Sequence, residues 1–121
     1  MSNKEIVLKF YEEVFNAWDL SKLDLYMRDD YIQHNPEVEN GKEGFKKFCN
    51  GFFQGKPVME IARIAEDGDM VFVFFKCTIG GTSLNKICDI YRLEGGMLAE
   101  HWDVCQHIPE GLVPANQNGL F

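Results

Sequence analysis

The sequence predicts an α+β domain in which three N-terminal helices pack on one face of a four-stranded antiparallel sheet. Apolar residues recur at three- and four-residue spacing in the first half of the chain, as amphipathic helices require. From Pro57 onward, runs rich in Val, Ile, Phe, Tyr and Thr alternate with Asp-Gly and Gly-Gly pairs that are typical of hairpins. Helices followed by strands favour an α+β architecture. With 121 residues, we expect one domain covering 1–121.

The three predicted helices have different boundary signals. The first covers about 3–17 and places its apolar side chains opposite Lys and Glu. Ser21 is the predicted N-cap of a short second helix. After an extended piece at 31–36, which ends at a proline, the third helix is expected from Lys42 to about Gln54.

The predicted strands are 58–66, 70–79, 82–93 and 97–107, followed by an irregular tail. The last hairpin carries Asp89, His101 and Asp103, and its register decides which face they occupy. A two-residue type I′ loop would set Asp89 opposite Trp102, whereas a G1 bulge at Gly96 would set it opposite His101. The bulge is favoured, and it places all three polar residues on one face.

These polar residues are the main candidates for chemistry. If the helices cover their face, two carboxyls and an imidazole lie in an apolar enclosure, where pKa values can move toward neutrality for proton transfer. The alternative is a structural hydrogen-bonded cluster, or a position on the outer face in water. The predicted catalytic residues are Asp89, His101, Asp103 and His34, whose loop could close the open end of a cavity. His34 could equally be a turn residue.

Six further residues are predicted to contact a substrate or form the wall of its pocket. Tyr11 could point its hydroxyl into the pocket, although simple core packing is the alternative. The set is Tyr11, Trp18, Asn35, Phe52, Phe74 and Tyr91.

Charge and motif content argue against several classes of function. Nineteen acidic and twelve basic residues give a net charge of −7, which would repel nucleic acid and anionic membranes. The start of the chain leads directly into an amphipathic pattern, no apolar run reaches membrane-spanning length, and the four cysteines form no C-x-x-C pair. We therefore expect a cytoplasmic protein with reduced cysteines, without nucleic-acid or membrane partners.

Motifs for common cofactors are absent from the sequence. There is no G-x-S-x-G elbow, P-loop, G-x-G-x-x-G or H-E-x-x-H. His101-Trp102-Asp103 matches the H-x-D of a facial-triad iron site, with His34 or His107 as the third ligand, but a three-residue match arises easily by chance. No metal ligand and no cofactor are predicted.

Several short motifs follow one another along essentially the whole chain. They are Tyr31-Ile32-Gln33-His34-Asn35-Pro36, Gly41-Lys42-Glu43-Gly44, Asp67-Gly68-Asp69, Asp89-Ile90-Tyr91-Arg92, Glu100-His101-Trp102-Asp103-Val104 and Ile108-Pro109-Glu110. Together they resemble the SnoaL-like polyketide cyclase group of the nuclear-transport-factor-2-like superfamily. The resemblance implies a cone-shaped α+β barrel, in which a curved sheet wraps the helices around one deep pocket, and a homodimer through the outer sheet face. It also implies polar pocket residues at positions like Asp89 and His101.

The resemblance further implies a reaction class. Cyclases of this shape close rings by intramolecular aldol chemistry without a metal or organic cofactor. Here Asp103 or Asp89 would withdraw a proton next to a carbonyl, and His101, His34 or Tyr11 would stabilise or protonate the enolate oxygen. The expected function is therefore aldol cyclisation, isomerisation or hydration of a small apolar carbonyl compound. The alternative is a non-catalytic module for small-ligand binding or accessory dimerisation.

Ketosteroid isomerases of the same superfamily offer a second comparison. Tyr11 and Asp89 fall where that family keeps its oxyanion-hole tyrosine and protonated aspartate, and Asn35 falls where it keeps the base. Because asparagine cannot abstract a proton, isomerisation by that route is not expected. Phe72, Phe74 and Phe75 replace polar residues of many relatives, which implies a more apolar ligand.

Overall fold

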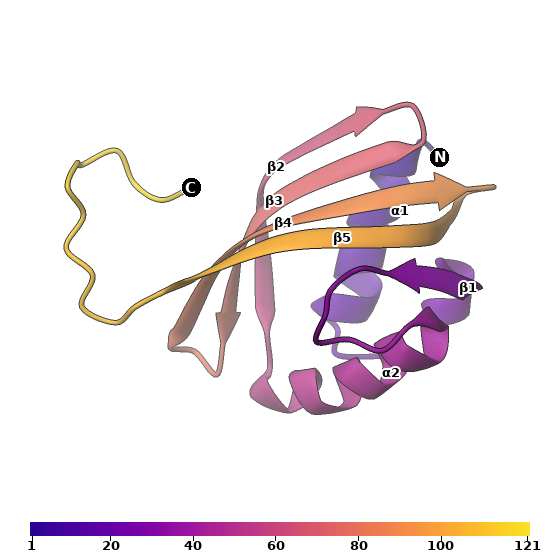
Figure 1. The fold of residues 1–121 in the computed structure, drawn as a ribbon, viewed down its shortest axis with the longest axis horizontal. Coiled ribbons are helices and arrows are strands. Elements are labelled where there is room, and N and C mark those ends of the chain that lie inside the picture. Colours follow the sequence, from indigo (N-terminus) through magenta and orange to yellow (C-terminus); the bar gives the residue numbers. More distant parts are fainter.

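Five strands form one mixed sheet in the spatial order β1-β5-β4-β3-β2. The computed structural model describes residues 1 to 121 without gaps. Its antiparallel part is the meander predicted from the sequence: β2 (Val58–Asp67), β3 (Met70–Ile79), β4 (Ser83–Glu94) and β5 (Met97–Ile108). Register shifts interrupt the β2–β3 and β4–β5 ladders, and bulges of this kind bend strands. Figure 1 shows the resulting strongly curved sheet.

The first strand is a correction to the predicted four-stranded antiparallel sheet. Residues Met27–Gln33 form β1, which pairs in parallel with β5, whereas the sequence indicated only an extended piece at 31–36. Only Met27 and Tyr31 of this strand are buried, so it lacks the regular alternation that reveals a strand. Charged residues on β1 suit its place at the edge of the sheet.

Two helices, rather than three, pack against the sheet. Helix α1 (Asn3–Phe10) begins at Ser2, whose hydroxyl accepts from the Glu5 backbone N–H at 3.1 Å, and continues as a π-helical turn, Tyr11–Phe15. Helix α2 (Gly41–Phe52), followed by a 3₁₀ turn at Phe53–Gly55, lies beside β1 (Figure 1).

The predicted second helix is a single 3₁₀ turn, Leu23–Leu25. Ser21 does not cap it, because the Ser21 hydroxyl and backbone N–H both donate to the Asp19 carboxylate at 2.9 Å. Ser21 is therefore held in a local turn by Asp19 and does not act as a helix N-cap.

The core lies between the helices and the concave face of the sheet. Val7, Phe10 and Val14 of the first helical segment are fully buried against strand residues such as Val71 and Val73. The tail after Ile108 has no regular structure, as predicted, and extends away from the sheet (Figure 1). None of the helices is both long and apolar enough to cross a lipid bilayer.

The register of the last hairpin differs from both predicted alternatives. Gly95 and Gly96 both have positive φ and form a two-residue loop that sets Glu94 opposite Met97. An extra residue, Ala99, then separates the Leu93–Leu98 pair from the next pair. As a result Asp89 faces Asp103 and Tyr91 faces His101, so the predicted pairing of Asp89 with His101 is wrong. Because of this extra residue, Asp89, His101 and Asp103 still share one face of the sheet, as predicted.

Candidate active site

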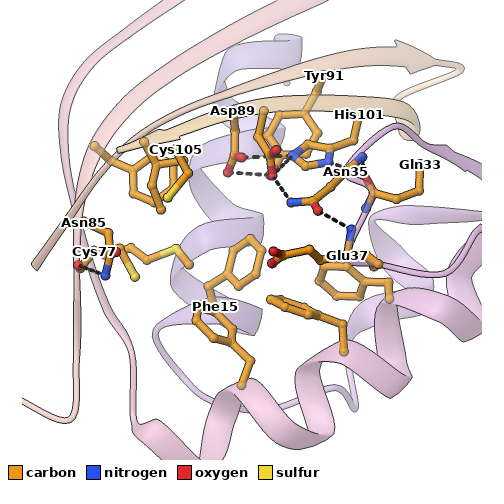
Figure 2. Close-up of a pocket in the computed structure, with 18 of the residues that line it drawn as sticks. Phe15, Gln33, Asn35, Glu37, Cys77, Asn85, Asp89, Tyr91, His101 and Cys105 are labelled. Carbon is orange, nitrogen blue, oxygen red and sulfur yellow. Dashed lines mark hydrogen bonds and ion pairs between the residues drawn. The ribbon is translucent and has the colours of Figure 1, made fainter. Parts of the chain in front are cut away.

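A cavity of about 290 Å³ opens between the concave face of the sheet and helix α2. Inward side chains alternate along β4 and β5, so a row of them reaches the cavity from each strand. Most lining residues are apolar, and Asp89 and His101 lie close to Gln33 and Asn35, whereas Asn85 and Glu37 lie apart from them (Figure 2). The lining residues are Phe15, Tyr31, Gln33, Asn35, Glu37, Val38, Phe45, Phe48, Phe52, Met59, Phe75, Cys77, Ile79, Asn85, Ile87, Asp89, Tyr91, His101, Asp103 and Cys105.

Asp89 is the centre of the polar cluster and is 5% exposed. Its Oδ2 accepts hydrogen bonds from the hydroxyls of Tyr11 and of Tyr91, the latter at 3.2 Å. Its Oδ1 lies 2.9 Å from Nε2 of His101, which is also buried. The two tyrosine oxygens lie 3.0 Å apart. Both Asp89 oxygens therefore have partners, as a buried carboxyl group requires.

Tyr11 reaches Asp89 from the π-helical turn. It lies on a segment with wider helical spacing, and such turns are frequent at functional sites. Burial, followed by the negative charge of Asp89, raises the pKa of both Tyr11 and Tyr91 well above 10. Both hydroxyls therefore stay protonated near neutral pH and can serve as hydrogen-bond donors to the carboxyl group.

Gln33 fixes the orientation of the His101 ring. The Gln33 Oε1 accepts from the backbone N–H of Asn35 at 3.0 Å, which identifies this atom as the amide oxygen. The same oxygen lies 2.7 Å from Nδ1 of His101, so Nδ1 carries a hydrogen. One further proton must then lie between Nε2 of His101 and Oδ1 of Asp89, because two lone pairs would repel there. Asp89 and His101 share that proton.

Asp103 is the more accessible carboxylate of the cluster, with a side chain that is 18% exposed. Its Oδ2 accepts from Nδ2 of Asn35 at 2.8 Å and lies 3.8 Å from Nε2 of His101. Unlike Asp89, it contacts no tyrosine hydroxyl. Asp103 thus combines a defined position with access to the cavity.

Most of the predicted site residues meet at this cavity. Asp89, His101, Asp103, Asn35, Phe52 and Tyr91 line it, and Tyr11 lies directly behind Asp89. Their placement at one cavity is a structural observation, and their roles in binding or catalysis stay predictions.

Three predicted residues lie elsewhere. His34, expected at the open end of the cavity, stacks on Trp102 at 4.7 Å between ring centroids and pairs with Glu100 on the outer face. Trp18 is 41% exposed and donates its indole N–H to the carbonyl of Pro57. Phe74 also points outward, where it packs on Phe121. Strand alternation brings its neighbour Phe75 to the cavity instead.

Sequence reasoning missed several residues of the site. Gln33 and Glu37 lie on either side of the predicted His34-Asn35 pair, and neither was assigned a role. Gln33 could have been found from strand parity, since it shares a face of β1 with the buried Tyr31. Phe15, Phe45 and Asn85 gave only the signals of core or strand residues.

The cluster has the donor types of a cation site. Ligand atoms of Asp89, His101 and Asp103 lie within 4.8 Å of one another. A cation would have to displace the proton shared by Asp89 and His101. The third ligands considered for an iron triad, His34 and His107, do not line the cavity and bond to Glu100 and Asn85 respectively.

A curved mixed sheet that encloses two helices and one ligand-sized cavity defines a nuclear-transport-factor-2-like α+β protein. The model of the SnoaL-like domain matches residues 7–101, and the chain belongs to this family. The resemblance drawn from the short motifs is therefore confirmed. No protein of curated function matches the sequence.

Solved structures agree on the fold. An uncharacterized cystatin fold protein from Novosphingobium aromaticivorans is 24% identical with a TM-score of 0.75, and the match covers 86% of this chain and 98% of that one. A SnoaL-like polyketide cyclase from Agrobacterium tumefaciens is 15% identical with a TM-score of 0.72, covering 88% and 92%. An NTF2-like protein of unknown function from Cytophaga hutchinsonii is 16% identical with a TM-score of 0.72, covering 88% and 91%.

Proposed function

We propose that this protein is a cofactor-independent acid/base enzyme that acts on a small apolar carbonyl compound. The observation that carries the proposal is the buried Asp89–His101 pair, with Oδ1 and Nε2 2.9 Å apart, beside the accessible Asp103 carboxylate in a largely apolar cavity. Proton-transfer enzymes combine such groups in an environment that excludes water. A polyketide cyclase among the proteins of similar fold is compatible with this chemistry.

The proposed reaction begins with proton transfer from carbon. Asp103 removes a proton from the carbon next to the substrate carbonyl, and the electron pair moves onto the carbonyl oxygen. The proton shared by Asp89 and His101 then stabilises or neutralises that oxygen, leaving an enol and a protonated Asp103. In an aldol closure the enol attacks an internal carbonyl, its hydroxyl proton returns to the Asp89–His101 pair, and the proton on Asp103 goes to the new alkoxide. In an isomerisation of an unsaturated ketone, the dienol takes the Asp103 proton at its γ carbon while its hydroxyl proton returns to the pair. Tyr11, Tyr91 and Gln33 position the pair.

Solvent exchange of an enolisable ketone tests the first step. β-Tetralone is a suitable probe, since it is apolar, aromatic and comparable with the cavity in size. We expect the protein to accelerate deuterium incorporation next to its carbonyl in D₂O, as followed by NMR. Asp103→Asn should lower the accelerated rate by roughly 100-fold or more, because it removes the base while keeping an oxygen that can accept from Asn35.

His34→Gln serves as the matched control, because it changes a polar residue of the same sheet region outside the cavity. It should leave the exchange rate unchanged. Retention of the full rate by Asp103→Asn would exclude Asp103 as the base. An unchanged amide NMR spectrum around the cavity would show that the substituted protein is still folded.

Ligand capture without catalysis is the second candidate function. It is favoured by one observation: every buried polar side-chain atom already has a hydrogen-bond partner. A structural cluster has the same property. Binding of β-tetralone without any acceleration of exchange would support this alternative and contradict the acid/base proposal.

A further inference from the structure

The charges that line the cavity are unbalanced. Glu37, Asp89 and Asp103 contribute carboxyl groups, and none of the lining residues is Lys or Arg. The Asp89–His101 pair is neutral overall whichever partner holds the shared proton. The negative charges of Asp103 and Glu37 therefore have no cationic partner of their own, apart from the more distant His101.

Glu37 brings its charge to the cavity from the loop between β1 and α2. Figure 2 shows its carboxylate pointing into the cavity among aromatic rings. Glu37 makes no ion pair, whereas Glu39 on the same loop pairs with Lys47 at 3.0 Å. The Glu37 backbone N–H donates to Oδ1 of Asn35 at 2.8 Å, and the same Asn35 amide holds Asp103. One side chain thus ties both negative residues to the same side of the cavity.

The Cys105 thiol lies in the field of these carboxyl groups. It lies on β5 two residues beyond Asp103 and lines the cavity. Burial raises the Cys105 pKa first, and the charges of Asp103, Asp89 and Glu37 raise it further. The charge of Glu37, on the loop between β1 and α2, therefore acts on the Cys105 thiol of β5 as well.

The remaining wall is aromatic. Phe48 and Phe52 of helix α2 stack with ring centroids 5.0 Å apart, and both line the cavity. Five more rings complete this wall: those of Phe15, Tyr31, Phe45, Phe75 and Tyr91. Aromatic faces attract cations and pack well against planar apolar groups.

We propose that the cavity binds an aromatic or similarly planar molecule that carries a protonated amine, with the ammonium group near Glu37 and Asp103. Any ligand that fills the cavity removes water from Asp103 and part of the water around the exposed Glu37, and desolvated charge is costly unless it is paired. An ammonium group supplies the pair, whereas an anionic ligand adds repulsion. The inference rests on the cavity of the proposed function and adds a protonated amine to the otherwise apolar carbonyl compound proposed as its substrate.

Three naphthalene derivatives of similar size test this preference by NMR titration. They are naphthylmethylamine, which is cationic at neutral pH, naphthalenemethanol, which is neutral, and naphthoate, which is anionic. We expect the amine to bind about fivefold or more tightly than the alcohol, the effect of one charge pair about 4 Å apart in water. Naphthoate should bind more weakly than either.

Glu37→Gln should reduce the advantage of the amine over the alcohol by about fivefold, while Glu39→Gln should preserve it. Naphthoate binding as tightly as the amine would overturn the inference. So would an unchanged preference in Glu37→Gln, or failure of the amine to bind at millimolar concentration. Because the readout is binding, these failures leave the deuterium-exchange test of catalysis unaffected.

Discussion

Alkaline pH should unfold this protein through its tyrosines. The chain contains four tyrosines, Tyr11, Tyr26, Tyr31 and Tyr91. Burial is the largest cause that raises the pKa of each, to about 12 for Tyr26 and well above 10 for the other three. In the unfolded chain, all four titrate near the ordinary tyrosine pKa of about 10.

The sign and size of the effect follow from linkage. Between pH 10 and the native pKa values, the unfolded chain releases protons that the folded chain retains, so the free energy of unfolding falls as pH rises. The full stabilisation is present below pH 10. Each tyrosine contributes a loss of about 1.4 kcal/mol per pH unit, or about 5.5 kcal/mol per unit for all four. That loss is comparable with the whole stability of a domain, about 5–15 kcal/mol.

Two measurements on the same samples test this prediction. Ultraviolet absorbance follows the ionisation of tyrosine, and far-ultraviolet circular dichroism follows the loss of secondary structure. We expect no ionisation step near pH 10 in the folded protein, and a single rise in tyrosinate that coincides with the loss of secondary structure. Tyr11→Phe should remove about a quarter of the rise, since one of four tyrosines is lost. A tyrosine that ionises near pH 10 while the dichroism persists would refute the buried, protonated state assigned to these hydroxyls.

Two further predictions concern the cavity mouth and the outer face. The charge near Cys105 can be measured in a Cys88→Ser background with two thiol reagents, the cationic trimethylammonium-ethyl and the anionic sulfonato-ethyl methanethiosulfonate. The ratio of the cationic to the anionic reaction rate should fall about fivefold when Glu37 is changed to Gln. An unchanged ratio would place the Glu37 charge away from Cys105. The homodimer through the outer sheet face stays a proposal, and it predicts that Val104→Glu shifts the mass measured by light scattering from dimer to monomer, because Val104 is 69% exposed there. A wild-type monomer at all concentrations would contradict it.

Much of the fold could be predicted because its signals are local. Strands β2 to β5 follow from β-branched runs and Gly-containing turns, and both helices follow from apolar periodicity. Strand β1 could not be found in the same way, because its conformation depends on parallel pairing with β5, a partner about 70 residues away in sequence. The predicted second helix failed because capping residues such as Ser21 are equally suited to turns.

The candidate site was predictable only where the alternation of side chains along a strand decides which face a residue occupies. Parity placed Asp89, His101 and Asp103 on one face, but the same rule, applied to β3, would have excluded Phe74. The environment of His34 was not predictable, although the sequence predicted the face of Trp102, on which the His34 ring stacks. The position of His34 depends on the path of its loop, and the sequence does not predict that path. Gln33 and Glu37 depend on that path as well.

Ala99 connects the fold to the proposed chemistry. The two-residue Gly95-Gly96 loop alone would place Trp102 opposite Asp89 and turn His101 to the outer face. One extra residue in β5 reverses that parity, so the polar residues face the cavity while Trp102 stacks on His34 outside. Turning buried polar groups inward is costly unless they are paired, and Gln33, Tyr11 and Tyr91 provide the pairing. The bulge next to this costly polar cluster favours the proposed acid/base site over simple packing, because three apolar side chains would fill the same space without those partners.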